Sequence, residues 1–332
     1  MDTEFKKYIA RKIDCSAFLN NAERLAIFCH FDADNIISEY IAHYLTELKN
    51  AGCDVVFVTN SHVSDEQVSK IKNSVNQIII RQNVGYDFGA YFTGYVEHRD
   101  KLSNYKNVLF INDSVFGPFY GLSKVFDKMS AQNLDMWGIS DAFHKHYHIQ
   151  SYFWAFKTSG AVLAVLDEEA KNYDFNLPKK DVVGKYEEGI TAKMLKAELK
   201  LGVLCSNAEA IDFEMNQNDD KTLKSLKADM VRIAKSKQSF VKKIKALFSV
   251  KTNRDCNFVV PDANAYLTGI NSCWYSMIKY FECPFIKVSL LKSPQNFRYH
   301  GFIYISLIKQ QYPLYNWTLI ENHLNRLKKI NN

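Results

Sequence analysis

The sequence predicts an α/β fold, with a mostly parallel sheet flanked by helices and a helical C-terminal extension. Two observations support this expectation. Short apolar runs, typical of buried strands, alternate along the first part of the chain with segments whose apolar residues recur at helical spacing. The pattern changes at a polar break, residues 216–220, after which the chain is rich in lysine and aromatic residues.

These features divide the chain into three expected parts. They are an N-terminal helical segment (1–23), the main α/β domain (24–215), and a basic, aromatic-rich helical region (216–332). Apolar runs predict strands at 25–29, 55–58, 78–80, 108–111, 136–139 and 152–156. Helical spacing predicts helices at 36–48, 159–171 and 188–200, and Ser64 with Gln67 matches a capping box for another helix.

Composition excludes several classes of protein. With 332 residues, 47% apolar and 23% charged, the chain can bury a core, so it is not a disordered, fibrous or disulfide-stapled protein. Its seven cysteines are scattered and form no Cys-x-x-Cys pair, which predicts reduced thiols and a cytoplasmic location. No apolar run is long enough for a membrane span, and no signal peptide is visible. Aromatic residues are unusually abundant, at 14%.

The first motif, Phe31-Asp32-Ala33-Asp34, follows the first predicted strand. Asp32 and Asp34 could bind a divalent metal through carboxylate oxygens, but Asp34 also stands where a helix N-cap belongs, and the cap is the favoured interpretation. Ligands of open α/β sheets bind at the carboxyl ends of strands, so Phe31, Asp32 and Asp34 are expected to line a site in either case. Asn60 follows the second strand and is expected to lie there as well.

The second motif, residues 81–91, follows the third predicted strand. Arg81 could present a fork of donors to a phosphate, beside Asn83, and Gly85 permits close backbone approach. Tyr86 could stack on a base or sugar, and Asp87 could accept from a hydroxyl. The alternative is a tight turn with a helix beginning at Asp87.

The third motif, Asn112-Asp113-Ser114, follows the fourth predicted strand. An acid at this place can hold a cation that bridges a diphosphate. Only one carboxylate is present, so a metal would need further ligands. A turn capped by Asn112 and Asp113 is an equally good interpretation.

The fourth motif contains His144, His146 and His148, followed by Gln150 and Ser151. Three histidines at alternate positions would share one face of a strand and suggest zinc, but no cysteine or carboxylate completes a set nearby. Polar contacts of His148, Gln150 and Ser151 to a sugar or phosphate are the preferred interpretation.

The fifth motif is Glu187-Glu188, at the start of a predicted helix. Acids in a first helical turn interact favourably with the helix dipole, and this structural interpretation leads on the residues alone. In a pocket, one of the two carboxylates could act as a general base toward an acceptor hydroxyl.

Together these segments resemble the rhamnan synthesis protein F family of bacterial polysaccharide glycosyltransferases. The resemblance spans roughly residues 24–295. Its matching pieces include Asn83–Tyr91 (Asn-Val-Gly-Tyr-Asp-Phe-Gly-Ala-Tyr), Asn112-Asp113-Ser114, His148–Phe153, Tyr186–Thr191 and Pro284-Phe285-Ile286-Lys287.

The resemblance implies a GT-A-like, Rossmann-related fold. It also implies transfer of a sugar, most often L-rhamnose from dTDP-L-rhamnose, onto a glycan or lipid-linked acceptor during O-antigen, capsule or cell-wall synthesis. By chain order, Asp113 would meet the diphosphate, with or without Mg²⁺ or Mn²⁺. An inverting reaction would take its base from Glu187-Glu188, with Glu188 slightly preferred. The alternatives are a different nucleotide-sugar donor, or a non-catalytic glycan-binding or scaffold subunit.

The Lys-rich segment 221–251 has two interpretations. A solvated amphipathic helix is one, and docking to an anionic membrane face, where lipid-linked acceptors reside, is the other. The net charge is only +6 and no nucleic-acid recognition motif accompanies the lysines, so a nucleic-acid partner is not expected.

Overall fold

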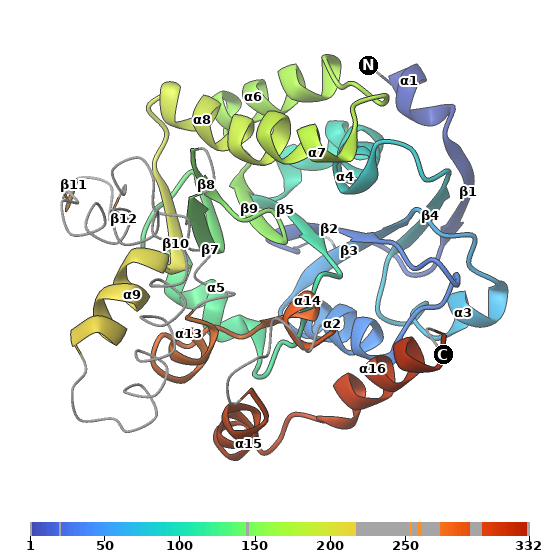
Figure 1. The fold of residues 1–332 in the computed structure, drawn as a ribbon. Helices are drawn as coiled ribbons and strands as arrows, with labels where there is room; N and C mark the ends of the chain where they lie inside the picture. The colour runs from blue at the N-terminus through green and yellow to red at the C-terminus, as the bar shows by residue number, and fades with distance from the viewer. Residues whose placement is uncertain are drawn as a thin grey trace.

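In the computed structural model, a central sheet lies between two layers of helices (Figure 1). The structure describes residues 2–19, 21–143, 146–216, 252–253, 258–259, 273–292 and 301–330. The described strands of the sheet follow the order β1-β4-β3-β2-β5-β9-β7-β10, and β8 pairs with β7. Their bounds are β1 Ile9–Asp14, β2 Arg24–His30, β3 Cys53–Thr59, β4 Gln77–Arg81, β5 Asn107–Asn112, β7 Met136–Phe143, β8 Tyr147–Ile149, β9 Phe153–Lys157 and β10 Leu201–Cys205.

The sheet is mixed but mostly parallel. Strands β2, β3, β4, β5, β7 and β10 run in one direction, and β1, β8 and β9 run in the other. The chain passes outward from β2 to β3 and β4, then returns to β5 on the other side of β2. The carboxyl ends of β2 and β5 therefore form a topological switch point, the usual place for a ligand in such sheets.

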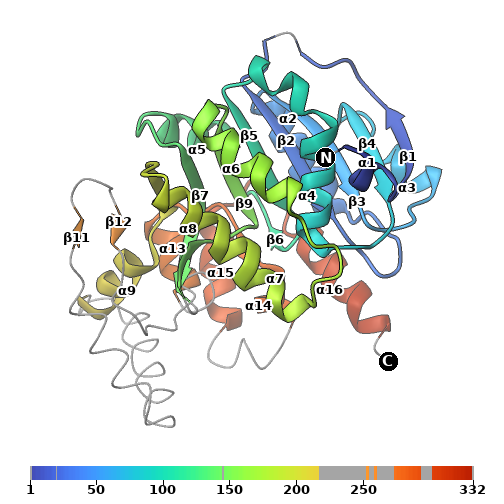
Figure 2. The same cartoon turned by 90° about the horizontal axis from the view of Figure 1, so that it is seen from above.

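Helices cover both faces of the sheet. Figure 2 shows α4, α6 and α8 over one face, and in Figure 1 α2, α5, α13 and α16 lie over the other. The first layer has the bounds α1 Asp2–Lys6, α4 Tyr86–Glu97, α6 Gly160–Lys171, α7 Lys179–Val182, η2 Val183–Glu188 and α8 Gly189–Lys196. The second has α2 Glu39–Asn50, α5 Leu122–Ser130, α13 Trp274–Tyr280 and α16 Thr318–Ile330.

Shorter elements complete the described chain. They are α3 Asp65–Ser69, η1 Arg99–Asn104, β6 Val115–Phe116, α9 Asn207–Asn216, β11 Thr252–Asn253, β12 Phe258–Val259, β13 Ile286–Lys287, α14 Val288–Lys292 and α15 Gly301–Gln311. Strand β13 pairs antiparallel with β6, so the C-terminal region reaches back to the segment after β5.

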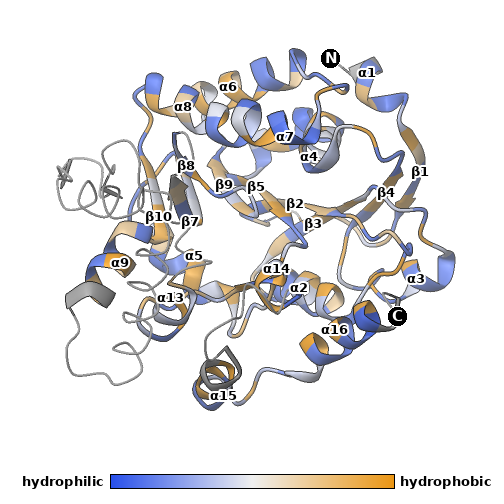
Figure 3. Ribbon diagram, viewed as in Figure 1, coloured by the Kyte–Doolittle hydropathy of each residue, from blue (hydrophilic) through white to orange (hydrophobic). Residues whose placement is uncertain are grey.

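Both faces of the sheet are buried, which explains why its strands are continuous apolar runs (Figure 3). In β2, Ala26 and Phe28 belong to the cluster under α2, while Leu25 and Ile27 belong to the cluster under α4. Most of the aromatic surplus packs in these clusters: Phe110 alone contacts the rings of four neighbours, Tyr91, Phe92, Tyr95 and Phe156.

The predicted α/β class and its strands are confirmed, with one clear error. Residues 1–23 were expected to be helical, but after the short α1 they form β1, which extends the sheet antiparallel to β4. The strand Ile-Ala-Arg-Lys-Ile-Asp lies at the sheet edge with mostly exposed side chains, so it lacks the apolar run that reveals a central strand. The proposed boundaries at 24 and 216 stay predictions.

The basic segment 221–251 lies outside the described residues. Helices α13, α14, α15 and α16 agree with the helical character expected for the C-terminal region. Within the described residues, no helix combines the length and the hydrophobicity needed to cross a bilayer.

Candidate functional site

Asp113 lies at the switch point between β2 and β5. Its Oδ2 accepts a hydrogen bond from the Phe31 N–H at 2.9 Å, and its carbonyl accepts one from the Tyr40 hydroxyl at 2.9 Å. Burial, reinforced by the nearby carboxylates Asp87 and Asp32, raises the pKa of Asp113 to about 8. This carboxyl group is therefore mostly protonated at neutral pH, and a cation beside it would stabilise its charged form.

Asp87 stands beside this acid, in the first turn of α4. The Asn112 side chain links the two strand-end motifs, because its Nδ2 donates to Asp87 Oδ2 at 3.1 Å. Burial raises the pKa of Asp87, and the charge of Glu187 raises it further. Gly85 turns the chain into α4 with a φ of 78°, and its carbonyl accepts from the Tyr173 hydroxyl at 2.5 Å.

Arg81 and Asn60 brace the loop before α4. Arg81 is fully buried, and its guanidinium donates to Asn60 Oδ1 at 2.6 Å and to the Val84 carbonyl at 2.9 Å. Asn60 in turn donates to the Tyr86 carbonyl at 3.1 Å. Both side chains therefore hold the 82–86 loop in place, and the expected binding of a phosphate by Arg81 stays a prediction.

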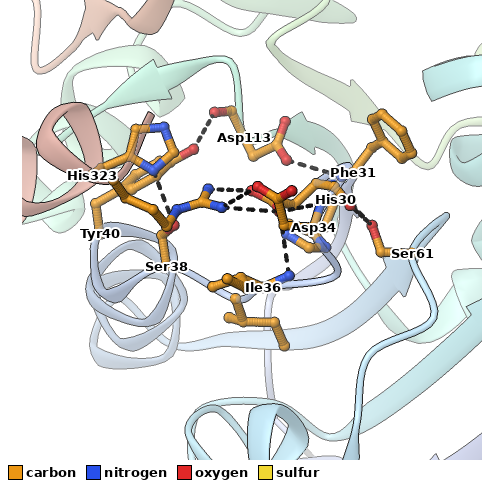
Figure 4. Close-up of polar contacts among 12 residues, drawn as sticks. His30, Phe31, Asp34, Ile36, Ser38, Tyr40, Ser61, Asp113 and His323 are labelled. Carbon is orange, nitrogen blue, oxygen red and sulfur yellow. Dashed lines mark hydrogen bonds and ion pairs between the residues drawn. The ribbon is translucent and has the colours of Figure 1, made fainter. Parts of the chain in front are cut away.

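The carboxylates of Asp32 and Asp34 face a guanidinium (Figure 4). Arg326 of α16 bonds to Asp34 Oδ2 at 2.9 Å and also to the Asp32 carboxylate. Asp32 Oδ1 additionally accepts from the Asp34 and Ile36 N–H groups. Although burial opposes it, Arg326 and these donors hold the pKa of Asp32 below its usual value. The Asp-Ala-Asp motif thus shapes the loop before α2 and binds Arg326. The N-cap of α2 is Ser38, so the favoured interpretation of Asp34 as a helix cap is wrong.

Glu187 lies close enough to Asp87 for its charge to act on that carboxyl group. The Glu187 Oε1 accepts the Ser151 N–H at 2.5 Å, and its charge acts on the pKa of both Asp87 and Lys287. Glu188 is only 3% exposed and belongs to the packed side of the η2–α8 segment. Consecutive helical side chains point about 100° apart, so the two carboxylates face different surroundings.

The segment 148–151 is buried and bonded to its own hairpin. His148 Nδ1 lies 3.1 Å from the His146 carbonyl, and Gln150 Oε1 accepts from the Ser140 hydroxyl at 2.8 Å. Ser151 anchors Glu187 through its N–H and accepts from Tyr91 through its carbonyl. These bonds give His148, Gln150 and Ser151 a supporting role, and their expected direct contacts to a sugar stay a prediction.

Few of the motif rings are open to a ligand. Phe31 is 46% exposed and Tyr86 37%, and Asn83 is also exposed. The other rings of these motifs are buried in the core: Phe88, Tyr91, Phe116, Tyr152 and Phe153. Phe31 adjoins Asp113 through its N–H, so an exposed ring is carried by the residue that bonds to this acid.

Sequence reasoning missed one cation of the site, Lys287 on β13. Its Nζ donates to the Ser114 hydroxyl at 3.4 Å and lies 4.1 Å from the centroid of the Tyr152 ring. Burial lowers the pKa of Lys287 to about 8, although Glu187 and Asp87 oppose that shift. The one feature of the sequence that points to Lys287 is the Pro284-Phe285-Ile286-Lys287 segment, which is part of the family resemblance.

The carboxylates of Asp113 and Asp87 suit a metal ion that arrives with its ligand, but they do not form a metal cage made of protein side chains alone. Nowhere in the described parts of the chain do three histidine, cysteine or acidic side chains gather as a metal cage, and His144 lies outside those parts. Mg²⁺ commonly uses one or two carboxylates and takes its other ligands from phosphates and water. Asp113, with Asp87 beside it, suits an ion of that kind delivered with a diphosphate.

Comparison with known proteins gives a consistent result. The family described as "Rhamnan synthesis protein F" matches residues 55–265. "Uncharacterized protein y4gN" of Sinorhizobium fredii (strain NBRC 101917 / NGR234) is 31% identical over 116 residues, 34% of this chain and 30% of that protein. "Virulence protein VirA" of Vibrio anguillarum is 31% identical over 150 residues, 44% of this chain and 47% of that protein. The matches span less than half the length of either relative.

Proposed function

Because the chain belongs to the rhamnan synthesis protein F family, we propose that it is a glycosyltransferase with a GT-A-like fold. Its donor is a nucleotide diphosphate sugar, and the donor that we expect is dTDP-L-rhamnose. Its acceptor is a hydroxyl of a glycan or lipid-linked saccharide that is built into a surface polysaccharide.

One observation carries this proposal: two acids from distant parts of the sequence, Asp113 and Asp87, lie at the switch point of the sheet, and the charge of a third, Glu187, reaches Asp87. Asp113 follows β5, Asp87 lies in the first turn of α4, and Glu187 is the penultimate residue of η2. Asn112 joins the first two, and the charge of Glu187 acts on Asp87. A cluster of perturbed carboxylates at this edge is typical of a site that handles an anionic ligand, a cation or a proton.

The nucleotide is expected at the mouth of this cluster. Phe31 and Tyr86 are the exposed rings of the strand-end motifs, and their faces suit a nucleobase or a sugar. Asn83, exposed two residues before Gly85, can supply a polar contact beside Tyr86. The diphosphate would then extend toward Asn112, Asp113 and Ser114.

The transfer itself requires a base and a stabilised leaving group. The acceptor oxygen attacks the anomeric carbon, the bond from that carbon to the diphosphate oxygen breaks, and the electron pair leaves with the nucleotide. Glu187 takes the acceptor proton: Ser151 fixes Oε1, so the carboxyl group can offer Oε2 to the hydroxyl. We therefore prefer Glu187 to Glu188 as the base. A Mg²⁺ or Mn²⁺ ion bound at Asp113 would offset charge on the diphosphate.

A donor panel tests this function. The purified chain would be incubated with dTDP-, UDP- and GDP-sugars, with a lipid-linked or oligosaccharide acceptor, and with Mg²⁺ or EDTA. We expect transfer from dTDP-L-rhamnose, and NMR of the product should show an inverted anomeric centre. Transfer of another sugar would support the glycosyltransferase activity and show that the donor is not dTDP-L-rhamnose. Glycan binding without binding or turnover of any donor would instead favour a non-catalytic subunit.

A further inference from the structure

Strand β13 brings an ammonium group into the acidic cluster from a distant part of the chain. Lys287 lies opposite Val115 in the β13–β6 pair, and the Val288 N–H donates to the Ser114 carbonyl at 2.9 Å. These backbone hydrogen bonds fix the position of the Lys287 backbone, from which its side chain extends. Its Nζ reaches the Ser114 hydroxyl at 3.4 Å and lies against the face of Tyr152. Lys287 thereby contacts Ser114, the residue that follows Asp113 in the sequence.

The hydrogen-bonding capacity of this ammonium is largely unused within the described chain. An ammonium has three N–H donors, and here Nζ makes one long hydrogen bond, to Ser114. No carboxylate oxygen of the described residues lies within 4.0 Å of it. Lys287 is half-buried, and an anion placed beside its ammonium would stabilise the charged form.

A purely structural role explains this geometry poorly. Asp87 and Glu187 are the nearby acids, but Asp87 already accepts from Asn112, and Glu187 already accepts from the Ser151 N–H. Neither needs Lys287 as a direct partner. The printed contact of the ammonium is with Ser114, the residue that follows Asp113, where the diphosphate is expected.

We propose that Lys287 binds the diphosphate of the nucleotide sugar and stabilises the charge that develops on it as the sugar leaves. This role of Lys287 rests on the proposed function and assigns to it a residue that binds the leaving group. When the bond between the anomeric carbon and the diphosphate oxygen breaks, both electrons stay on that oxygen. Lys287 keeps its proton and donates a charge-assisted hydrogen bond to the phosphate oxygens.

The first test is binding of nucleotides to the full chain by calorimetry in EDTA, with dTDP, UDP and GDP and their monophosphates. Lys287→Met should weaken binding of the preferred diphosphate about 10- to 100-fold, as expected for a lost hydrogen bond between charged groups, and weaken the monophosphate less. Lys287→Arg should restore most of the affinity. Lys196→Met, at an exposed lysine of α8, is the matched control and should bind as the wild type does.

The second readout is proton uptake, which needs no variant to detect. Lys287 faces Glu187 from η2, Asp87 from α4, Cys283 before β13 and the Tyr152 ring. With its pKa at about 8, Lys287 is half protonated at pH 8, and a bound diphosphate raises that pKa. Lys287 should then contribute about half a proton to the uptake when dTDP binds at pH 8, measured in two buffers of different ionisation enthalpy. Asp113 also titrates near pH 8, so the uptake that Lys287→Met loses is the share due to the lysine.

The outcomes separate the two proposals. If folded Lys287→Met binds the diphosphate as tightly as wild type and takes up the same protons, the role of Lys287 is refuted while the transferase proposal stands. If wild-type protein binds no nucleoside diphosphate, with or without Mg²⁺, both proposals fail together. Circular dichroism and the melting temperature establish that each variant is folded.

Discussion

Arg326, near the end of the described chain, binds both Asp32 and Asp34 in the loop that follows the first central strand (Figure 4). The same loop gives its Phe31 N–H to Asp113. His323, one turn earlier on α16, lies 2.9 Å from the Ser38 hydroxyl at the start of α2. The C-terminal helix therefore helps to hold the mouth of the candidate site.

Replacing Arg326 should loosen this loop. Arg326→Met leaves two carboxylates without their guanidinium, one of them largely buried, and we expect a loss of about 2 kcal/mol in the free energy of unfolding by urea. Lys309→Met, which removes an exposed ion pair between Lys309 of α15 and Glu321 of α16, should cost less than about 1 kcal/mol. Equal losses in the two variants would contradict a special role for the Arg326 contacts.

The stability of the protein should depend on pH through Asp113. Its pKa is about 8 in the folded chain and near 3.8 ordinarily, so between these values the folded state alone keeps the proton. The stabilisation is fully present below pH 4 and is lost as the pH rises through 8. The stability of wild type relative to Asp113→Asn should therefore fall between pH 5 and pH 9, measured by urea unfolding. A pH-independent difference would show that Asp113 ionises normally.

The two neighbouring glutamates provide a matched pair for the base assignment. Glu187→Gln should lower kcat about 10²- to 10⁴-fold, the usual contribution of a general base, while donor affinity changes little. Glu188→Gln should keep most of the turnover of the protein that folds, because its side chain is only 3% exposed and is not open to an acceptor. The reverse pattern would return the base to Glu188.

Gly85 should resist substitution. Its φ of 78° is in the left-handed region, and an added Cβ would lie 2.9 Å from Tyr173 Cε1. We expect Gly85→Ala to destabilise the fold by about 1–3 kcal/mol and to weaken donor binding through displacement of Tyr86 and Asp87. Gly160→Ala, where a Cβ meets nothing within 4 Å, is the control and should leave the melting temperature nearly unchanged.

Local sequence patterns predicted the sheet well because its strands are buried on both faces. The apolar runs at 25–29, 55–58, 78–80 and 108–111 all lie in central strands, and their carboxyl ends place Asp87 and Asp113 together as expected. The edge strand β1 escaped prediction since its exposed residues, such as Arg11 and Lys12, carry no periodic apolar signal.

The rest of the site depends on contacts that no local pattern encodes. Lys287 is 173 positions from Ser114, and Arg326 is 294 positions from Asp32. The motif at 148–151 misled for a different reason: polar side chains such as Gln150 satisfy buried hydrogen bonds, and from sequence this cannot be told from contact with a ligand.

The measurement that tests the account most directly is release of dTDP from dTDP-L-rhamnose, in the presence of acceptor, by wild-type protein and by Asp113→Asn. We predict that wild type releases dTDP as it transfers the sugar. The Asp113→Asn variant, once shown to be folded, should release dTDP at least about 10-fold more slowly under the same conditions. Wild-type protein that neither binds nor turns over any nucleotide sugar, or an Asp113→Asn variant with undiminished activity, would contradict a donor site at the junction of β2 and β5.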